Sequence, residues 1–131
     1  MVTMKLKCLI VEDVTFIREI YRYSLRNENY EIIGEAADGI DALLKIKNLQ
    51  PDIVILDLIL PLKNGLDVLK EAHQLSPQSR FIVISSIDDM ATIEFAKNLG
   101  AIDYLVKPFT KNQLLESLFK ISQNYSEVQS G

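Results

Sequence analysis

The sequence has a single cysteine, no excess of basic residues and no long apolar run. Cys8 lies in an apolar segment without a second cysteine to pair with, which is typical of a buried thiol in a reducing, cytoplasmic protein. Lys and Arg number 14 against 18 Asp and Glu, giving a net charge of -4, whereas nonspecific nucleic-acid binding requires clustered basic side chains. The longest apolar stretch, residues 53–62, is interrupted by Asp57 and is shorter than the roughly 20 residues of a membrane span. We therefore expect a cytoplasmic protein without membrane insertion or direct nucleic-acid contact.

The chain does contain enough apolar residues for one domain with a substantial core. Hydrophobic residues make up 48% of its 131 positions, and a domain of this size buries about two-thirds of its unfolded surface. No internal repeat is visible, and residues 123–131 are polar and small. We expect one domain over residues 1–131, with its core at about 5–122, a polar tail at 123–131 and no output domain.

Short apolar runs alternate with segments whose apolar residues follow helical spacing. The runs are residues 6–11, 31–36, 53–56, 81–84 and 102–106, and the helical segments cover 17–25, 42–46, 66–75, 93–100 and 114–121. Turn-forming pairs separate them, including Asp38-Gly39, Asn64-Gly65 and Ser76-Pro77. Strands that alternate with helices indicate an α/β fold, so we predict a doubly wound parallel sheet of five strands with five helices, in whose usual order the first and third strands are neighbours.

Polar residues stand where four of the apolar runs end. Glu12 and Asp13 follow the first run, Asp57 follows the third, Ser85 the fourth and Lys107 the fifth. Ligands of open parallel sheets bind at the carboxyl ends of the strands. The three carboxylates there would repel one another and need a cation, for which Mg²⁺ with oxygen ligands is the natural choice. A lysine and a hydroxyl beside them suit phosphoryl oxygens.

Each of these residues also has a plain structural interpretation. Asp57 alone could cap a turn before Pro61, Lys107 could simply neutralise part of the acidic cluster, and Ser85 could cap a helix that starts at Asp88. Only the combination of the strand-end positions points to a phosphoryl and metal site.

The chain resembles the receiver domains of bacterial two-component response regulators, in size the single-domain chemotaxis type, over about residues 5–122. The motifs that carry the resemblance are Val11-Glu12-Asp13, Asp57-Leu58-Ile59-Leu60-Pro61 with Asn64-Gly65, Ser85, and Lys107-Pro108-Phe109. The resemblance implies the flavodoxin-like receiver fold, with the five strands in the order 2-1-3-4-5. It also implies a phosphoacceptor signalling protein that catalyses only its own phosphotransfer and dephosphorylation and is otherwise not an enzyme.

The resemblance assigns roles to individual residues. Asp57 matches the phosphoacceptor, which takes a phosphoryl group from a sensor histidine kinase or a histidine phosphotransfer protein. Glu12 and Asp13 match the acidic pair that holds Mg²⁺, completed by Asp57 and the backbone carbonyl of Ile59. Lys107 matches the partner of Asp57 and of the phosphoryl group, and its peptide bond to Pro108 is expected to be cis.

Ser85 and Tyr104 match the switch pair of the family. In that scheme Ser85 moves toward the new phosphate and Tyr104 rotates inward, which changes the surface of the fourth helix, fifth strand and fifth helix for an unidentified output protein. Ile59 and Ile87 flank the phosphoryl site, and we expect these apolar side chains to give a long-lived phosphorylated state. The small Ser86, where the family more often has alanine, should leave access open.

Several alternatives stay open or are weakened by the sequence. The chain could be the receiver of a larger DNA-binding regulator, although its fifth helix lacks the arginine that such dimers usually pair with an aspartate like Asp103; a monomer or a phosphorylation-dependent homodimer both fit. It could also be a phosphorelay intermediate. A flavin carrier is disfavoured by Glu12 and Asp13 in the first loop, and an aspartate-nucleophile phosphatase by Ile59. His73, the only histidine, is expected on the surface.

Overall fold

Five strands and five helices alternate along residues 5–130, the part of the chain that the computed structural model describes. The strands are β1 (Leu6–Val11), β2 (Tyr30–Ala36), β3 (Ile53–Leu56), β4 (Arg80–Ser85) and β5 (Ala101–Val106). The helices are α1 (Thr15–Leu25), α2 (Gly39–Leu49), α3 (Gly65–Leu75), α4 (Met90–Asn98) and α5 (Lys111–Ser130). Each predicted strand and helix is present, with ends shifted by a few residues except at the end of α5, which is longer than predicted.

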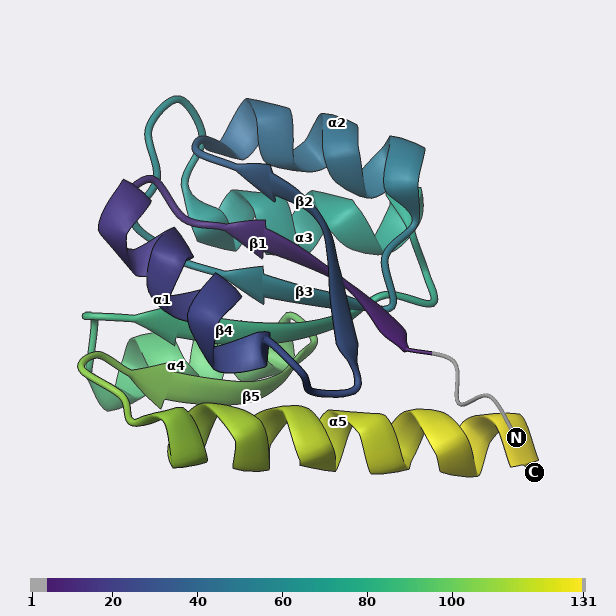
Figure 1. Ribbon diagram of the computed structural model, residues 1–131. Coiled ribbons are helices and arrows are strands. Elements are labelled where there is room, and N and C mark those ends of the chain that lie inside the picture. Colours follow the sequence, from purple (N-terminus) through teal and green to yellow (C-terminus); the bar gives the residue numbers. More distant parts are fainter. Residues whose placement is uncertain (1–4, 131) are drawn as a thin grey trace.

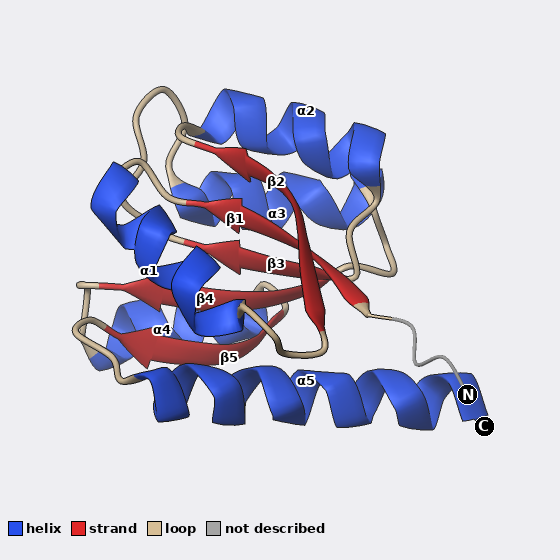
Figure 2. Ribbon diagram, in the orientation of Figure 1, coloured by secondary structure: helices blue, strands red, loops and turns tan. Residues whose placement is uncertain are grey.

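The strands form one parallel sheet in the order β2-β1-β3-β4-β5, which confirms the predicted topology. All arrowheads point the same way, so the loops that follow the strands gather at one edge (Figure 2). The central strand β3 is buried along its full length, which explains why its sequence is apolar at every position rather than at alternate ones.

Helices cover both faces of the sheet (Figure 1). On one face, α2, α3 and α4 pack on the sheet through buried residues such as Ala42, Ile46, Leu69 and Ala96. On the other, α1 and α5 contribute Tyr21, Leu25, Leu114, Leu118 and Ile121. These two apolar layers hold the sheet rigid, so that its carboxyl edge can present polar groups in fixed positions.

Side-chain caps explain where three of the helices begin. Asp38 accepts the backbone N–H of Asp41 at 2.7 Å, and Asn64 accepts that of Asp67 at 3.0 Å. Asp89 accepts both the N–H and the hydroxyl of Thr92. Each cap satisfies an N–H group that the first turn of a helix leaves unpaired, which supports the turn positions expected from the sequence.

The surface position expected for His73 is wrong. The ring is half-buried, with Nε2 2.5 Å from the carbonyl oxygen of Leu99, and it packs edge-on against Phe81 at 5.5 Å between ring centres. The end of α3 lies beside the turn that leads from α4 into β5, and the histidine fills the space between them.

The last helix is longer than the apolar spacing that predicted it. That spacing ends at Ile121, whereas α5 continues to Ser130 and so includes most of the expected polar tail. Within residues 5–130, none of the helices combines the length and the apolar character needed to cross a membrane.

Candidate functional site

The loops after β1 and β3 bring three carboxylates together. Val11 and Leu56 are register partners at the ends of these adjacent strands, and the Asp57 N–H donates to the Val11 carbonyl at 3.0 Å. Carboxylate oxygens of Glu12, Asp13 and Asp57 consequently lie within 4.8 Å of one another. Glu12 and Asp57 are only 1% and 5% exposed, while Asp13 is exposed. The crowding expected from the sheet order is therefore present.

Lys107 reaches into this cluster from the end of β5. Its Nζ donates to Glu12 Oε1 at 2.6 Å and to Asp57 Oδ2 at 2.7 Å. The Lys107 N–H is bonded to the Ser85 carbonyl at 2.9 Å, which fixes the backbone below the side chain. The peptide bond to Pro108 is cis, as the resemblance implied.

The pKa values of Lys107 and Glu12 reflect this arrangement. Burial opposes the charge of Lys107, but the hydrogen bonds to Asp57 and Glu12 outweigh it and raise the lysine pKa. Burial also raises the pKa of Glu12, and the charge of Asp57 adds to that rise; the bonds from Lys107 and from the Val14 N–H offset it only in part. One ammonium thus serves a cluster of three carboxylates.

Oxygen donors with surplus negative charge are what Mg²⁺ prefers, because this ion takes carboxylates and retains several waters. The residues present therefore fit the ion. The backbone carbonyl of Ile59 is the fourth ligand expected from the resemblance, and the loop that carries it is tied to the site, since the Ile59 N–H donates to Asp57 Oδ1 at 3.1 Å. Through this hydrogen bond from the Ile59 N–H, Asp57 also caps the turn that follows β3. The structural interpretation of Asp57 as a turn cap is therefore compatible with its position in the cluster.

A glycine allows α3 to start against the acidic loop. A Cβ on Gly65 would lie 2.5 Å from the Leu58 Cα and would overlap the Asp57 carbonyl oxygen. The Gly65 N–H donates to the Leu58 carbonyl at 2.8 Å. The start of α3 thus presses directly on the backbone of Asp57, which explains the glycine in the Asn64-Gly65 pair.

Ser85, the last residue of β4, and Tyr104, within β5, lie beside the cluster. Ser85 is fully buried, and its hydroxyl accepts the Ile87 N–H at 3.4 Å. It does not cap α4, because Asp89 does so. Tyr104 is 8% exposed and already points inward, with its hydroxyl donating to the Ile87 carbonyl at 2.6 Å. Burial raises the Tyr104 pKa, the Ser85 hydroxyl opposing this in part.

One aromatic contact next to the site was not foreseen. Tyr21 of α1 stacks on Phe109 with ring centres 5.4 Å apart and planes at 4°. Burial and the charges of Glu12 and Asp57 raise the Tyr21 pKa. Phe109 follows Lys107 and Pro108 in the motif already noted, but helical spacing marks Tyr21 only as a core residue. The stack joins α1 to the loop that carries the lysine.

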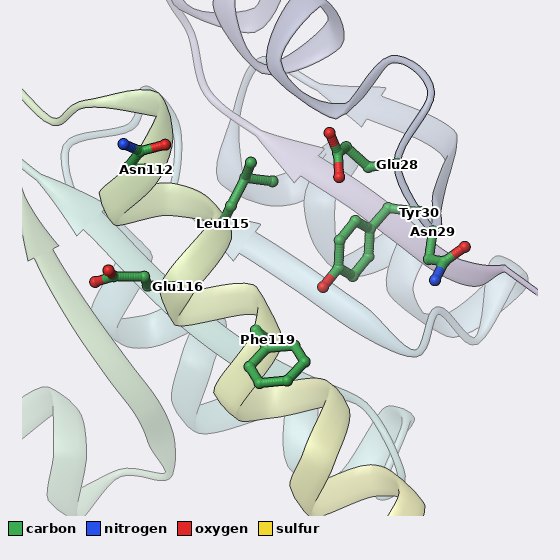
Figure 3. Close-up of a pocket in the computed structure, with 7 residues that line it drawn as sticks. All are labelled: Glu28, Asn29, Tyr30, Asn112, Leu115, Glu116 and Phe119. Carbon is green, nitrogen blue, oxygen red and sulfur yellow. The ribbon is translucent and has the colours of Figure 1, made fainter.

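A groove of about 390 Å³ lies elsewhere, between the start of β2 and α5 (Figure 3). Tyr30 points toward α5 across it and bonds to Ser122 at 3.1 Å. The residues that line it are Glu28, Asn29, Tyr30, Asn112, Leu115, Glu116 and Phe119. The groove contains no residue of the carboxylate site and is a separate surface feature.

Comparison with known proteins gives the family. The model of the response regulator receiver domain matches residues 8–119. The chain belongs to the response regulator receiver family. Chemotaxis protein CheY of Thermotoga maritima is 38% identical over 117 residues, which cover 89% of this receiver and 98% of that protein. This agreement supports a receiver of the chemotaxis type.

Two further relatives bear on the fold and on length. The CheX-CheY-BeF3-Mg²⁺ complex from Borrelia burgdorferi contains a chain that superimposes with a TM-score of 0.87 at 28% identity, covering 90% of each chain. Transcriptional regulatory protein PdtaR of Mycobacterium tuberculosis is 33% identical over 124 residues, covering 93% of this receiver but 59% of that protein. Receivers are phosphoacceptor domains of two-component signalling rather than conventional enzymes.

Proposed function

We propose that this receiver accepts a phosphoryl group on Asp57 from a histidine kinase or a histidine phosphotransfer protein. The observation that carries the proposal is the double hydrogen bond of Lys107 Nζ, which holds Glu12 and Asp57 together within the three-carboxylate cluster. An ion pair with a purely structural role needs one carboxylate. Lys107 instead faces three carboxylates, one of which follows the fully buried strand β3.

The chemistry requires positioning and charge neutralisation more than covalent assistance. An Asp57 oxygen attacks the phosphorus, the P–N bond to the donor histidine breaks as the new P–O bond forms, and the imidazole leaves with the electron pair. Lys107 Nζ, now bonded to Asp57 Oδ2, is placed to follow the charge onto the phosphoryl oxygens. Burial of Asp57 excludes bulk water from the acyl phosphate.

We propose Glu12, Asp13, Asp57 and the Ile59 carbonyl as the residues that hold Mg²⁺. The bound ion would neutralise the surplus carboxylate charge and the charge of the phosphoryl oxygens. The Borrelia burgdorferi relative that was solved in a complex with BeF3 and Mg²⁺ supports this assignment.

Ser85 and Tyr104 are proposed to report the phosphoryl group to the surface of α4, β5 and α5. The inward Tyr104, anchored on the Ile87 carbonyl, corresponds to the end point of the expected rotation. A phosphoryl group that draws the Ser85 hydroxyl toward Asp57 would favour this position over an outward one. We propose that an output protein binds this surface, without assigning its identity. The cytoplasmic location stays a prediction from the lone cysteine.

A role inside a longer regulator also fits, because PdtaR is longer than the region matched. The structure supplies one observation against the aspartate-pairing dimer of such regulators. Asp103 already accepts the Ser117 hydroxyl at 2.7 Å and pairs with Lys120 at 3.3 Å within the same chain. A phosphorelay intermediate would use the same acidic site, and only its partners would differ.

Intact mass after incubation with Mg²⁺ and acetyl phosphate tests the proposal directly. We expect the parent to gain one phosphoryl group that hydroxylamine removes. Chelation of Mg²⁺ before the incubation should prevent this gain. The Asp57→Asn variant should gain none. A parent that stays unmodified would contradict the phosphoacceptor function and indicate a receiver that interacts with partners independently of phosphorylation.

A further inference from the structure

The loop between β3 and α3 contacts the start of α2, a helix from a different βα unit. The carbonyl of Pro61, in this loop, accepts the Gly39 N–H at 3.2 Å and the Lys63 N–H at 2.7 Å. Leu62, between Pro61 and Lys63, has a φ of 69°, a left-handed conformation that is unfavourable for leucine. The loop therefore turns sharply around one carbonyl group that Gly39 holds in place.

There is no room for a side chain at this contact. A Cβ on Gly39 would lie 2.7 Å from both the carbonyl carbon and the Cβ of Lys63 and would overlap the Lys63 carbonyl oxygen. The overlap is with backbone, which cannot rotate away as a flexible side chain does. Either α2 or the loop would have to retreat by roughly an ångström or more.

The loop is the part that would move. The first turn of α2 is capped by Asp38, and the helix is anchored in the core by Ala42 and Ile46, both fully buried. The loop has no residue of comparable burial between Ile59 and Asn64. The ion pair of Lys63 with Glu71 of α3, at 2.5 Å, is partly exposed to solvent and therefore holds the loop only weakly.

Displacement of this loop would reach the proposed Mg²⁺ ligands. Ile59 lies two residues before Pro61, and its N–H is bonded to the Asp57 carboxylate. We propose that Gly39 is a positioning residue for Mg²⁺ binding. Because it has no side chain, the start of α2 can contact the backbone of the loop and so fix the position of the Ile59 carbonyl, which the same loop carries. This inference rests on the proposed function and adds to it a residue that touches none of the proposed ligands.

Gly39→Ala tests the inference, with Gly34→Ala as the matched control. A Cβ on Gly34 would meet only the flexible ends of Leu49, at 3.0 Å, and Leu9, at 3.3 Å. We expect Gly39→Ala to weaken Mg²⁺ affinity by about 10-fold to 100-fold in calorimetric titration, the size usual for residues that orient metal ligands. The rate of phosphorylation by acetyl phosphate should need correspondingly more Mg²⁺ for half-saturation yet approach the parent rate at saturation.

Amide exchange in the parent chain gives a second test, which does not depend on whether Gly39→Ala folds. Mg²⁺ should slow exchange of the Gly39 N–H along the same titration curve as the Ile59 N–H, because the Gly39 N–H donates to Pro61 of the loop that contains Ile59 and that the ion would fix. The Asp41 N–H, which bonds to Asp38 instead, serves as the internal reference.

The outcomes separate this inference from the proposed function. A folded Gly39→Ala protein with the Mg²⁺ affinity of the parent and of Gly34→Ala overturns the positioning role alone, as does a Gly39 amide indifferent to Mg²⁺. A parent that neither binds Mg²⁺ nor gains a phosphoryl group overturns the proposed function, and the inference with it.

Discussion

Two largely buried aspartates of this receiver, Asp57 after β3 and Asp103 in β5, have opposite electrostatic surroundings. Their side chains are 6% and 15% exposed. Asp57 shares one ammonium with Glu12 and lies close to Asp13 as well. Asp103 has three donors to itself, namely the Ser117 hydroxyl, the Tyr104 N–H at 2.9 Å and Lys120.

The comparison separates a site from a structural contact. At Asp103, burial pushes the pKa upward, but the three donors together lower it, so the charged form is stabilised by the fold. At the cluster, burial and the neighbouring charge raise the pKa of Glu12. The fold thus supplies Asp103 with enough donors to stabilise its charge, whereas the three carboxylates of the cluster share one ammonium. The cluster, and not Asp103, is therefore the place where a cation would be stabilised.

Removing the shared ammonium should have the largest effect. We expect Lys107→Ala to lower the free energy of unfolding of the metal-free protein by about 3 kcal/mol, because it leaves buried carboxylates unpaired. The matched change Lys120→Ala should cost about 0.5 kcal/mol or less, because that lysine is 65% exposed and its ion pair is screened by solvent. Urea unfolding measures both, and Mg²⁺ should restore part of the loss only in Lys107→Ala. Equal costs for the two lysines would contradict the comparison.

Removing a carboxylate from the cluster should have the opposite sign. We expect Asp57→Asn to raise the free energy of unfolding without Mg²⁺ by about 1–2 kcal/mol, since it relieves like-charge crowding and keeps the shape of the side chain. Thermal melts with and without Mg²⁺ check this, and Mg²⁺ should stabilise the parent more than the variant. A variant that melts below the parent in the absence of Mg²⁺ would show that Lys107 already balances the cluster.

The cluster could be predicted from the sequence, whereas the surroundings of Asp103 could not. Strand ends are visible as apolar runs that stop at a polar residue, and parallel topology then places Glu12, Asp57 and Lys107 at one edge without knowledge of packing. The donors to Asp103 come from Ser117 and Lys120 of α5. Which residues of a helix face a particular strand residue depends on how that helix packs, and helical spacing alone does not specify it.

The same reason accounts for the other missed contacts. His73 bonds to a backbone carbonyl of Leu99, and Gly39 contacts the backbone of Lys63. Backbone groups are present at every residue, so no pattern of side chains marks these partners. The sequence pattern therefore places a polar residue late in a helix on the surface, and it marks a glycine at a helix start only as a turn former.

Asp103 is surrounded by polar donors, whereas two of the residues expected beside a phosphoryl group on Asp57 are apolar. Ser117 contacts Asp103, whereas Ile59, 52% exposed, and the half-buried Ile87 are proposed to flank the phosphoryl site, where their apolar side chains would not orient an attacking water. We expect Ile59→Asn and Ile87→Glu together to speed loss of the phosphoryl group from Asp57 by about tenfold, equivalent to about 1.4 kcal/mol in the barrier. The decay of phosphorylated protein after removal of the donor measures this. Leu44→Asn, at an exposed apolar residue of α2, is the control. An unchanged lifetime of the phosphorylated double variant would contradict the role proposed for Ile59 and Ile87.

The smallest effect is expected at Asp103, where its pH dependence is informative. We expect Asp103→Asn to lower the free energy of unfolding by about 1 kcal/mol at neutral pH, because the donors lose a charged acceptor. The pKa of Asp103 is lowered by folding, so its contribution is fully present above the ordinary value of 3.8 and is lost as the pH falls through the folded value. Urea unfolding of parent and variant over a series of acidic pH values should therefore show the gap closing below about 3.8. A gap that persists unchanged at the lowest pH would mean that the charge of Asp103 does not stabilise the fold, and the contrast with the Asp57 cluster would no longer be one of satisfied against unsatisfied carboxylates.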